Sequence, residues 1–142
     1  MNHYTTSLEI NRSAADVFKA ISSQLDGWWG HQDHPVTELG TVFKVSWGEP
    51  WYQFKAVKYL PNEEMIWECI DANQIINGLE GVQKEWVGTN VHWRLKSLGD
   101  ARTQLNFKHE GLVPTFICFN VCSRAWTDFL QQHLVSYLEG HP

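Results

Sequence analysis

The chain has 142 residues, of which 43% are hydrophobic and 19% are charged, and its formal net charge at pH 7 is −5. This length and composition predict a single globular domain over residues 1–142, and the negative charge argues against binding to nucleic acid or, by charge alone, to an anionic membrane. There is no signal-peptide pattern and no apolar run near the roughly 18–20 residues of a membrane span, so we expect a cytoplasmic protein without a membrane partner.

The N-terminal part predicts one strand followed by a short helix. Tyr4–Ile10 is rich in Tyr, Thr, Leu and Ile, which is typical of a strand. Ser13 offers a hydroxyl N-cap, with Asp16 three residues further on, and the apolar spacing that follows predicts a helix ending near Gln24. The segment Gly30–Gly40 is predicted to be a loop.

The middle of the chain predicts an antiparallel meander. Five more strands are expected, over Val42–Trp47, Trp51–Leu60, Met65–Ile70, Trp86–Lys96 and Thr103–His109. Most of these strands are joined by short turns, so neighbouring strands should pair antiparallel. The segment Asp71–Lys84 has no readable pattern and stays unassigned. In the last two strands alternation places Trp93 and His109 on the inward face.

A long amphipathic helix is predicted at the C-terminus. Pro114 suits its start, it runs to about Glu139, and Gly140 is a plausible C-cap. Apolar residues recur at helical spacing, namely Phe119, Cys122, Trp126, Phe129, Leu130, Leu134 and Leu138. Such a helix is on the order of 35 Å long and can cover one face of the sheet. The predicted fold class is therefore α+β, with helices on one side of an antiparallel sheet.

Tryptophan is unusually frequent, with eight residues in the chain. They are Trp28, Trp29, Trp47, Trp51, Trp67, Trp86, Trp93 and Trp126. Each indole buries about 150–250 Å² and carries one N–H donor. Because a domain of this size has one modest core, we expect several indoles to wall a cavity between the sheet and the C-terminal helix. The alternative is that they are ordinary core and strand residues.

Several segments match, in order, a known family pattern. Ile10–Phe18 fits a strand-to-helix opening I-x-x-S-x-x-x-V-F, Trp28-Trp29 follows, and Gly40-Thr41-Val42-Phe43 fits a strand entry. The closing strand pair is matched by Trp86–Trp93 and Phe107–Leu112, and the C-terminal helix by Arg124–Leu138. Together these segments resemble the START-like (SRPBCC, helix-grip) superfamily, and within it the branch named for the activator of heat-shock protein 90 ATPase.

The resemblance implies a curved six- or seven-stranded antiparallel sheet wrapped around a long C-terminal helix, with short helices after the first strand. It also implies a cavity for a small molecule under that helix. Members of the superfamily include lipid and hormone carriers, aromatic-polyketide cyclases and chaperone activators, so the likeness does not imply one reaction. The co-chaperones carry a further N-terminal domain that resembles nothing in this chain, so a chaperone partner is only an alternative.

Three functional hypotheses follow. The first is a non-catalytic carrier or sensor of a small hydrophobic or aromatic molecule. The second is an enzyme of the cyclase or dehydratase kind, in which His109 handles a proton. The third is a module that stimulates a chaperone through its surface. Exposed aromatic side chains at strand edges also make a homodimer conceivable.

The candidate ligand-binding residues are those expected to face the cavity. They are Trp28, Trp47, Phe54, Trp67, Cys69, Trp93, His109, Phe119, Cys122 and Trp126. For His109 the alternative to a catalytic role is a buried imidazole whose hydrogen bonds are satisfied by its neighbours.

No metal or cofactor is expected. Two of the three cysteines, Cys118 and Cys122, are four residues apart on the predicted helix, but two thiols alone do not form a tetrahedral zinc site. The cluster His31-Gln32-Asp33-His34 could supply ligands, yet a solvated loop is the favoured interpretation. The common hydrolase, dinucleotide, P-loop and zinc-protease motifs do not occur.

Overall fold

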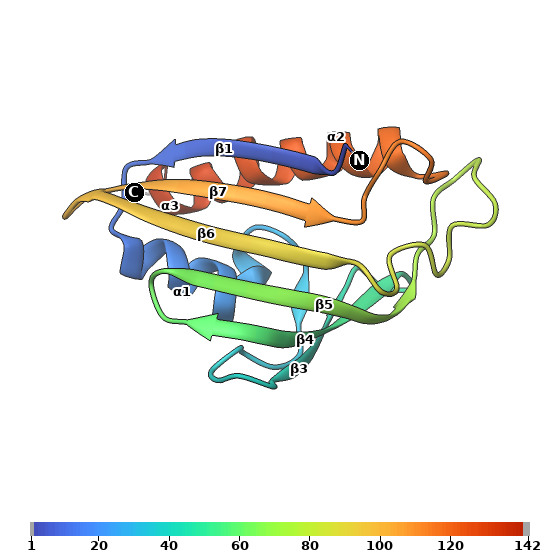
Figure 1. The fold of residues 1–142 in the computed structure, drawn as a ribbon, viewed down its shortest axis with the longest axis horizontal. Helices are drawn as coiled ribbons and strands as arrows, with labels where there is room; N and C mark the ends of the chain where they lie inside the picture. The colour runs from blue at the N-terminus through green and yellow to red at the C-terminus, as the bar shows by residue number, and fades with distance from the viewer. Residues whose placement is uncertain (1, 141–142) are drawn as a thin grey trace.

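The computed structural model describes residues 2–140, and its centre is one seven-stranded antiparallel sheet in the order β1-β7-β6-β5-β4-β3-β2. The strands are β1 (Tyr4–Ile10), β2 (His31–Gln32), β3 (Val42–Ser46), β4 (Trp51–Leu60), β5 (Glu64–Asn73), β6 (Asn90–Gly99) and β7 (Arg102–Glu110). The helices lie on one side of this sheet, with the C-terminal helices behind β1 and β7 (Figure 1). The predicted α+β, helix-grip architecture is confirmed.

The first helix, α1 (Ala14–Ser23), begins where the sequence predicts. The Ser13 hydroxyl oxygen accepts a hydrogen bond from the Asp16 backbone N–H at 3.1 Å, which satisfies one of the free donors of the first turn. A short 3₁₀ turn, η1 (Leu25–Gly27), follows. This turn leads directly into Trp28 and Trp29, so the helix end fixes where both indoles enter the core.

The C-terminal helix starts later than predicted and is not uniformly α-helical. It consists of α2 (Phe119–Asp128), a π-helical turn η2 (Phe129–Leu134) and α3 (Val135–Glu139). The expected start near Pro114 is wrong because the chain first turns, and the Glu85 carboxylate then accepts hydrogen bonds from the backbone N–H groups of Ile117 at 2.7 Å and Cys118 at 3.0 Å. A carboxylate from a distant loop therefore caps this helix.

Other strand boundaries also differ from the predicted ones, and three of these differences bear on the site. β6 begins at Asn90 and not at Trp86, because Gly88 has a φ of +91° and the Thr89 N–H closes a turn onto the Trp86 carbonyl at 3.0 Å. β5 extends to Asn73, so it includes the first three residues of the unassigned segment Asp71–Lys84. The predicted loop after η1 contains the short edge strand β2.

The sheet side chains that face the helices form the core. The predicted inward positions of β6 and β7, including Trp93 and His109, are buried. The β4–β5 ladder contains two bulges, where Val57 and Ile70 have no partner opposite them, and bulges increase the local bend of a sheet. Among residues 2–140, no helix is both long and apolar enough to cross a bilayer.

Candidate functional site

Seven of the eight indoles converge in one aromatic cluster. Their ring centroids are linked by contacts of 5.0–6.1 Å. Trp51 lies apart from this cluster, where the Lys44 ammonium is 4.2 Å from its ring centroid.

One end of the cluster is solid. Trp67 and Trp93 are fully buried and their rings are 5.2 Å apart, and Phe54 packs 5.1 Å from Trp67. Trp28 closes this end, with its ring edge-on to Trp93 at 6.0 Å and its N–H bonded to the Ala20 carbonyl at 3.0 Å. At this end the rings therefore pack directly against one another.

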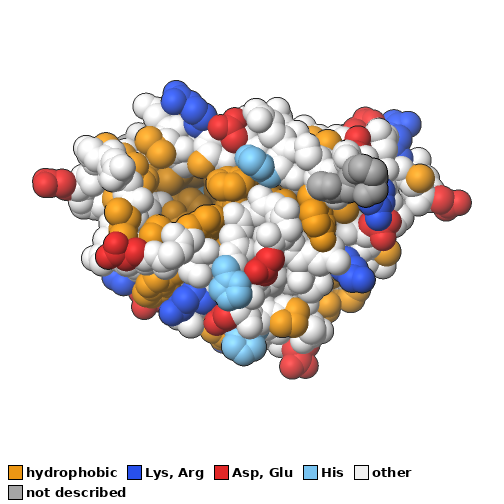
Figure 2. All heavy atoms as spheres, turned by 180° about the vertical axis from the view of Figure 1, so that it is seen from behind, with side chains coloured by type: hydrophobic (Ala, Val, Ile, Leu, Met, Phe, Trp, Pro, Cys, Tyr) orange, Lys and Arg blue, Asp and Glu red, His pale blue; other side chains and the backbone are white. Residues whose placement is uncertain are grey.

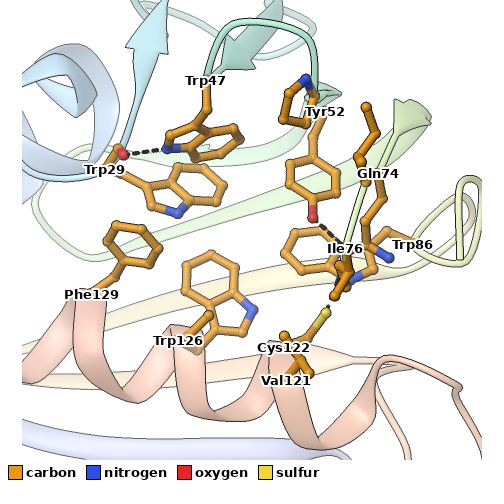
Figure 3. A pocket seen from close by; sticks show the side chains of 13 residues that line it. Trp29, Trp47, Tyr52, Gln74, Ile76, Trp86, Val121, Cys122, Trp126 and Phe129 are labelled. Carbon is orange, nitrogen blue, oxygen red and sulfur yellow. Dashed lines mark hydrogen bonds between the residues drawn. The ribbon is translucent and has the colours of Figure 1, made fainter. Parts of the chain in front are cut away.

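The other end of the cluster opens into a pocket of about 240 Å³ between β4, the loop after β5 and α2. Its aromatic lining consists of Trp29, Trp47, Tyr52, Trp86, Trp126 and Phe129, and we call it the tryptophan pocket. Figure 3 shows these side chains converging on the pocket from β4, from the C-terminal helix and from the loops that carry Trp29, Trp47 and Trp86. A hollow lined by hydrophobic side chains is visible on the face opposite to that of Figure 1 (Figure 2).

The structure separates the ten predicted site residues into two groups. Trp47, Cys122 and Trp126 line the tryptophan pocket. The other seven do not line it, and they are Trp28, Phe54, Trp67, Cys69, Trp93, His109 and Phe119. All of these are buried except Phe119, which is half-buried at the first position of α2.

Sequence reasoning missed several lining residues for which a signal existed. Trp29 is the neighbour of Trp28, and Tyr52 shares the inward face of β4 with Phe54 by simple alternation. Phe129 belongs to the apolar series of the C-terminal helix. No pattern pointed to Gln74, because it lies in the unassigned segment.

The pocket presents flat ring faces. The ring planes of Trp29 and Tyr52 differ by 5°, those of Tyr52 and Trp86 by 16°, and those of Trp86 and Trp126 by 14°. Trp47 stands nearly perpendicular, at 76° to Trp29. Parallel faces with one edge-on ring give a guest aromatic both stacking and edge-to-face contacts.

The pocket wall is electrically neutral. None of its described lining residues is an Asp, Glu, Lys, Arg or His. Burial raises the pKa of the Tyr52 phenol, so it stays protonated. Hydrogen bonding with the Cys118 thiol, together with burial, raises the pKa of Cys122. A ligand in this pocket therefore meets no ionised group.

Gln74 ties the loop after β5 to the pocket wall. Its side-chain carbonyl accepts hydrogen bonds from the Tyr52 hydroxyl at 2.5 Å and from the Cys122 thiol at 3.4 Å. Its amide N–H donates to the Val82 carbonyl at 2.9 Å. The side chain is 4% exposed, so these bonds satisfy an otherwise costly buried amide.

His109 is fixed behind the pocket by two hydrogen bonds. The Trp126 N–H donates to its Nδ1 at 3.0 Å, so the ring proton is on Nε2, which donates to the Thr89 hydroxyl at 2.8 Å. That hydroxyl in turn donates to the Trp86 carbonyl at 2.6 Å. Burial lowers the pKa of His109 to about 3, so the imidazole is neutral and positions two pocket residues, Trp86 and Trp126.

The loop that contains His31 and His34 does not form a metal site. His31 pairs with Asp26 at 2.9 Å and His34 with Asp33 at 3.2 Å, and all four side chains are well exposed. Within residues 2–140, no three His, Cys, Asp or Glu side chains come together in a way that could hold a metal ion.

Comparisons with known proteins identify the fold. No protein-family model matches the chain, and no curated protein matches it. Among solved structures, the Aha1 dimer from Colwellia psychrerythraea has a TM-score of 0.76 at 18% identity, with 100% of both chains covered. CalU16 from Micromonospora echinospora has a TM-score of 0.70 at 15% identity, with 97% of this chain and 74% of CalU16 covered.

DynU16, a protein of the dynemicin biosynthetic locus, has a TM-score of 0.76 at 17% identity over 100% of this chain and 49% of DynU16. This chain therefore spans about half the length of DynU16. The fold of this chain is therefore the START-like, helix-grip fold, and the predicted likeness to Aha1 is confirmed for the fold alone.

Proposed function

We propose that this domain binds a small, neutral, hydrophobic or aromatic molecule in the tryptophan pocket and acts as a carrier or sensor. The observation that carries the proposal is an open, uncharged pocket of about 240 Å³ with six aromatic side chains in its wall. Ligand sites are commonly concave and mostly apolar, with few polar groups, and this pocket fits that description. The expected cytoplasmic location stays a prediction.

The structure does not favour the cyclase-like or dehydratase-like alternative. A general acid or base must come within hydrogen-bond reach of the reacting group. His109 is fully buried behind the pocket wall, and both of its ring nitrogens are hydrogen-bonded to Thr89 and Trp126. Its role in the proposal is to hold the Trp126 indole in place.

The likeness to Aha1 bears on partners. The Colwellia psychrerythraea protein is described as a dimer, which supports a homodimer as a second expectation for this chain. A chaperone partner stays an alternative. Sedimentation of the pure protein with and without a ligand separates self-association from small-molecule binding.

The proposal is tested by filling the pocket. Ala125 lines the pocket from α2, and in the Ala125→Phe variant the added ring occupies the ligand space. We expect naphthalene, titrated by calorimetry, to bind the wild type and to bind Ala125→Phe at least tenfold more weakly. The control is Ala15→Phe on the exposed face of α1, which should bind like the wild type. If naphthalene does not bind the wild type, the proposal fails.

A further inference from the structure

The hydrogen-bonding groups of the pocket wall are nearly all engaged within the protein. The Trp47 N–H donates to the Trp29 carbonyl at 2.7 Å, and the Trp126 N–H donates to His109 at 3.0 Å. The Gln74 side-chain carbonyl accepts from both Tyr52 and Cys122, which uses its two lone pairs. The Gln74 carbonyl therefore has no lone pair left for a ligand, and the side-chain acceptors that remain in the wall are the Tyr52 hydroxyl oxygen and the weakly accepting Cys122 sulfur.

Two indole N–H groups of the wall remain, and they differ in access. The Trp86 nitrogen is buried beside the thiols of Cys118 and Cys122, so a pocket ligand does not reach it. The Trp29 N–H has no acceptor among residues 2–140, and its nitrogen is not fully buried. In Figure 3 the Trp29 nitrogen points toward the α2 side of the pocket, with no hydrogen bond drawn to it.

Trp29 is at the same time firmly held. It is 7% exposed, and its ring packs 5.0 Å from Trp126 and 5.2 Å from Trp47. The donor therefore has a fixed position and direction, and little entropy is lost when it binds an acceptor. A rigid, unpaired donor in an apolar wall gains from a ligand acceptor, because water in such a pocket has few other partners.

The volume limits the ligand size. A cavity of about 150 Å³ accepts benzene. The tryptophan pocket has a volume of about 240 Å³. It therefore exceeds the benzene-binding cavity by less than the volume of a second such cavity. One aromatic ring or two fused rings therefore fit, and the neutral wall disfavours an ionised ligand.

We propose that the tryptophan pocket selects a neutral, flat molecule of one or two aromatic rings that carries a hydrogen-bond acceptor, and that the Trp29 N–H recognises this acceptor. This inference rests on the proposed function. An aromatic ring nitrogen or a carbonyl oxygen on the ligand pairs with the Trp29 N–H, whereas a ligand without an acceptor leaves this donor unpaired, which costs free energy.

The test compares two ligands of nearly the same shape, quinoline and naphthalene, at pH 7.5, where quinoline is neutral. In Trp29→Phe the aromatic face is kept and the donor is removed. We expect this substitution to weaken quinoline about three- to tenfold more than naphthalene, the value of one neutral hydrogen bond. In the control Trp47→Phe the lost N–H was already paired with the Trp29 carbonyl, so both ligands should change by the same factor.

A second measurement on the wild type keeps the test independent of how the variants fold. The Trp29 indole N–H resonance, assigned by NMR, should move downfield with quinoline and not with naphthalene. Suppose that both ligands bind, that Trp29→Phe weakens both by the same factor, and that both shift the Trp29 resonance equally. The inference is then overturned while the proposed function stands. If neither ligand binds the wild type, both are overturned.

Discussion

The two ends of the aromatic cluster are built from the same residue types, but one end is solid core and the other end borders the tryptophan pocket. At the solid end, Trp67 and Trp93 are fully buried and in contact with each other, and Trp28 closes over Trp93. At the open end, Trp29 and Trp47 meet a loop and the start of α2, which leave a pocket between them. The comparison shows that the residues packed against an indole decide whether it is a core residue or part of a pocket wall. The number of tryptophans in the sequence therefore predicts an aromatic cluster but does not locate the pocket.

The largest expected effect comes from removing an indole of the solid end. Trp67→Ala leaves a cavity among fully buried rings and should lower the free energy of unfolding by roughly 3–5 kcal/mol. Trp47→Ala removes a half-buried indole beside open space and should cost only about 1–2 kcal/mol. Urea unfolding of both variants measures this contrast.

Ligand binding should show the opposite order. Under conditions where both variants are folded, Trp47→Ala should lose affinity for naphthalene, and Trp67→Ala should keep most of it. Equal stability losses, or binding lost only in Trp67→Ala, would mean that the cluster is one undivided core.

An intermediate effect is expected from His109, which is buried behind the pocket wall. Burial lowers its pKa to about 3, whereas an imidazole in the unfolded chain titrates near 6.5. The unfolded state therefore takes up the proton first, and stability that is fully present above about pH 6.5 is lost as the pH falls toward 3. Between pH 7.5 and pH 5 this loss is about 2 kcal/mol.

The pH dependence is measured by urea unfolding at several pH values, with His109→Gln as the comparison. The amide of glutamine also offers one donor and one acceptor, but it does not titrate. Between pH 7.5 and pH 5, the unfolding free energy of His109→Gln should fall by about 2 kcal/mol less than that of the wild type. Parallel pH profiles for the two proteins would contradict the assignment of a neutral, buried His109.

The smallest effect should come from Tyr52→Phe, which sharpens the chemistry of the open end. The hydroxyl of Tyr52 donates to Gln74, so its loss costs about 1 kcal/mol of stability and frees one lone pair of the Gln74 carbonyl. The Gln74 carbonyl can then accept a hydrogen bond from a ligand donor, and we expect indole to bind about threefold more tightly, measured by calorimetry. Tyr59→Phe on the same strand is the control and should leave indole binding unchanged.

Most of the fold could be predicted because its signals are local and periodic. The Ser13 cap, the β4 bounds and the alternation of β6 and β7 all appear in the structure. The wrong boundaries at Trp86 and Pro114 have different causes. The first depends on a local turn that needs the positive φ of Gly88, and the second depends on a contact distant in sequence, the Glu85 carboxylate at the start of α2.

The site was less predictable for a geometric reason. Alternation and helical spacing identify which side chains point inward, but not how closely the inward ones pack. Phe54 and Tyr52 share one face of β4, yet the first is sealed among other rings and the second borders the pocket. The loop that supplies Gln74 has no periodicity, so its part in the wall could not be foreseen.

The wide turn η2 sets how the last helix lies along the sheet. Trp126, Leu130, Leu134 and Leu138 are all buried and are spaced by four residues. In a regular α-helix each four-residue step rotates a side chain by about 40°, so after three steps the row would have turned about 120° away. The π-helical hydrogen bonds of η2 put more residues into one turn and take up this drift. The four-residue spacing of this buried row therefore requires the wide turn, because a regular α-helix with the same sequence would turn Leu138 away from the sheet.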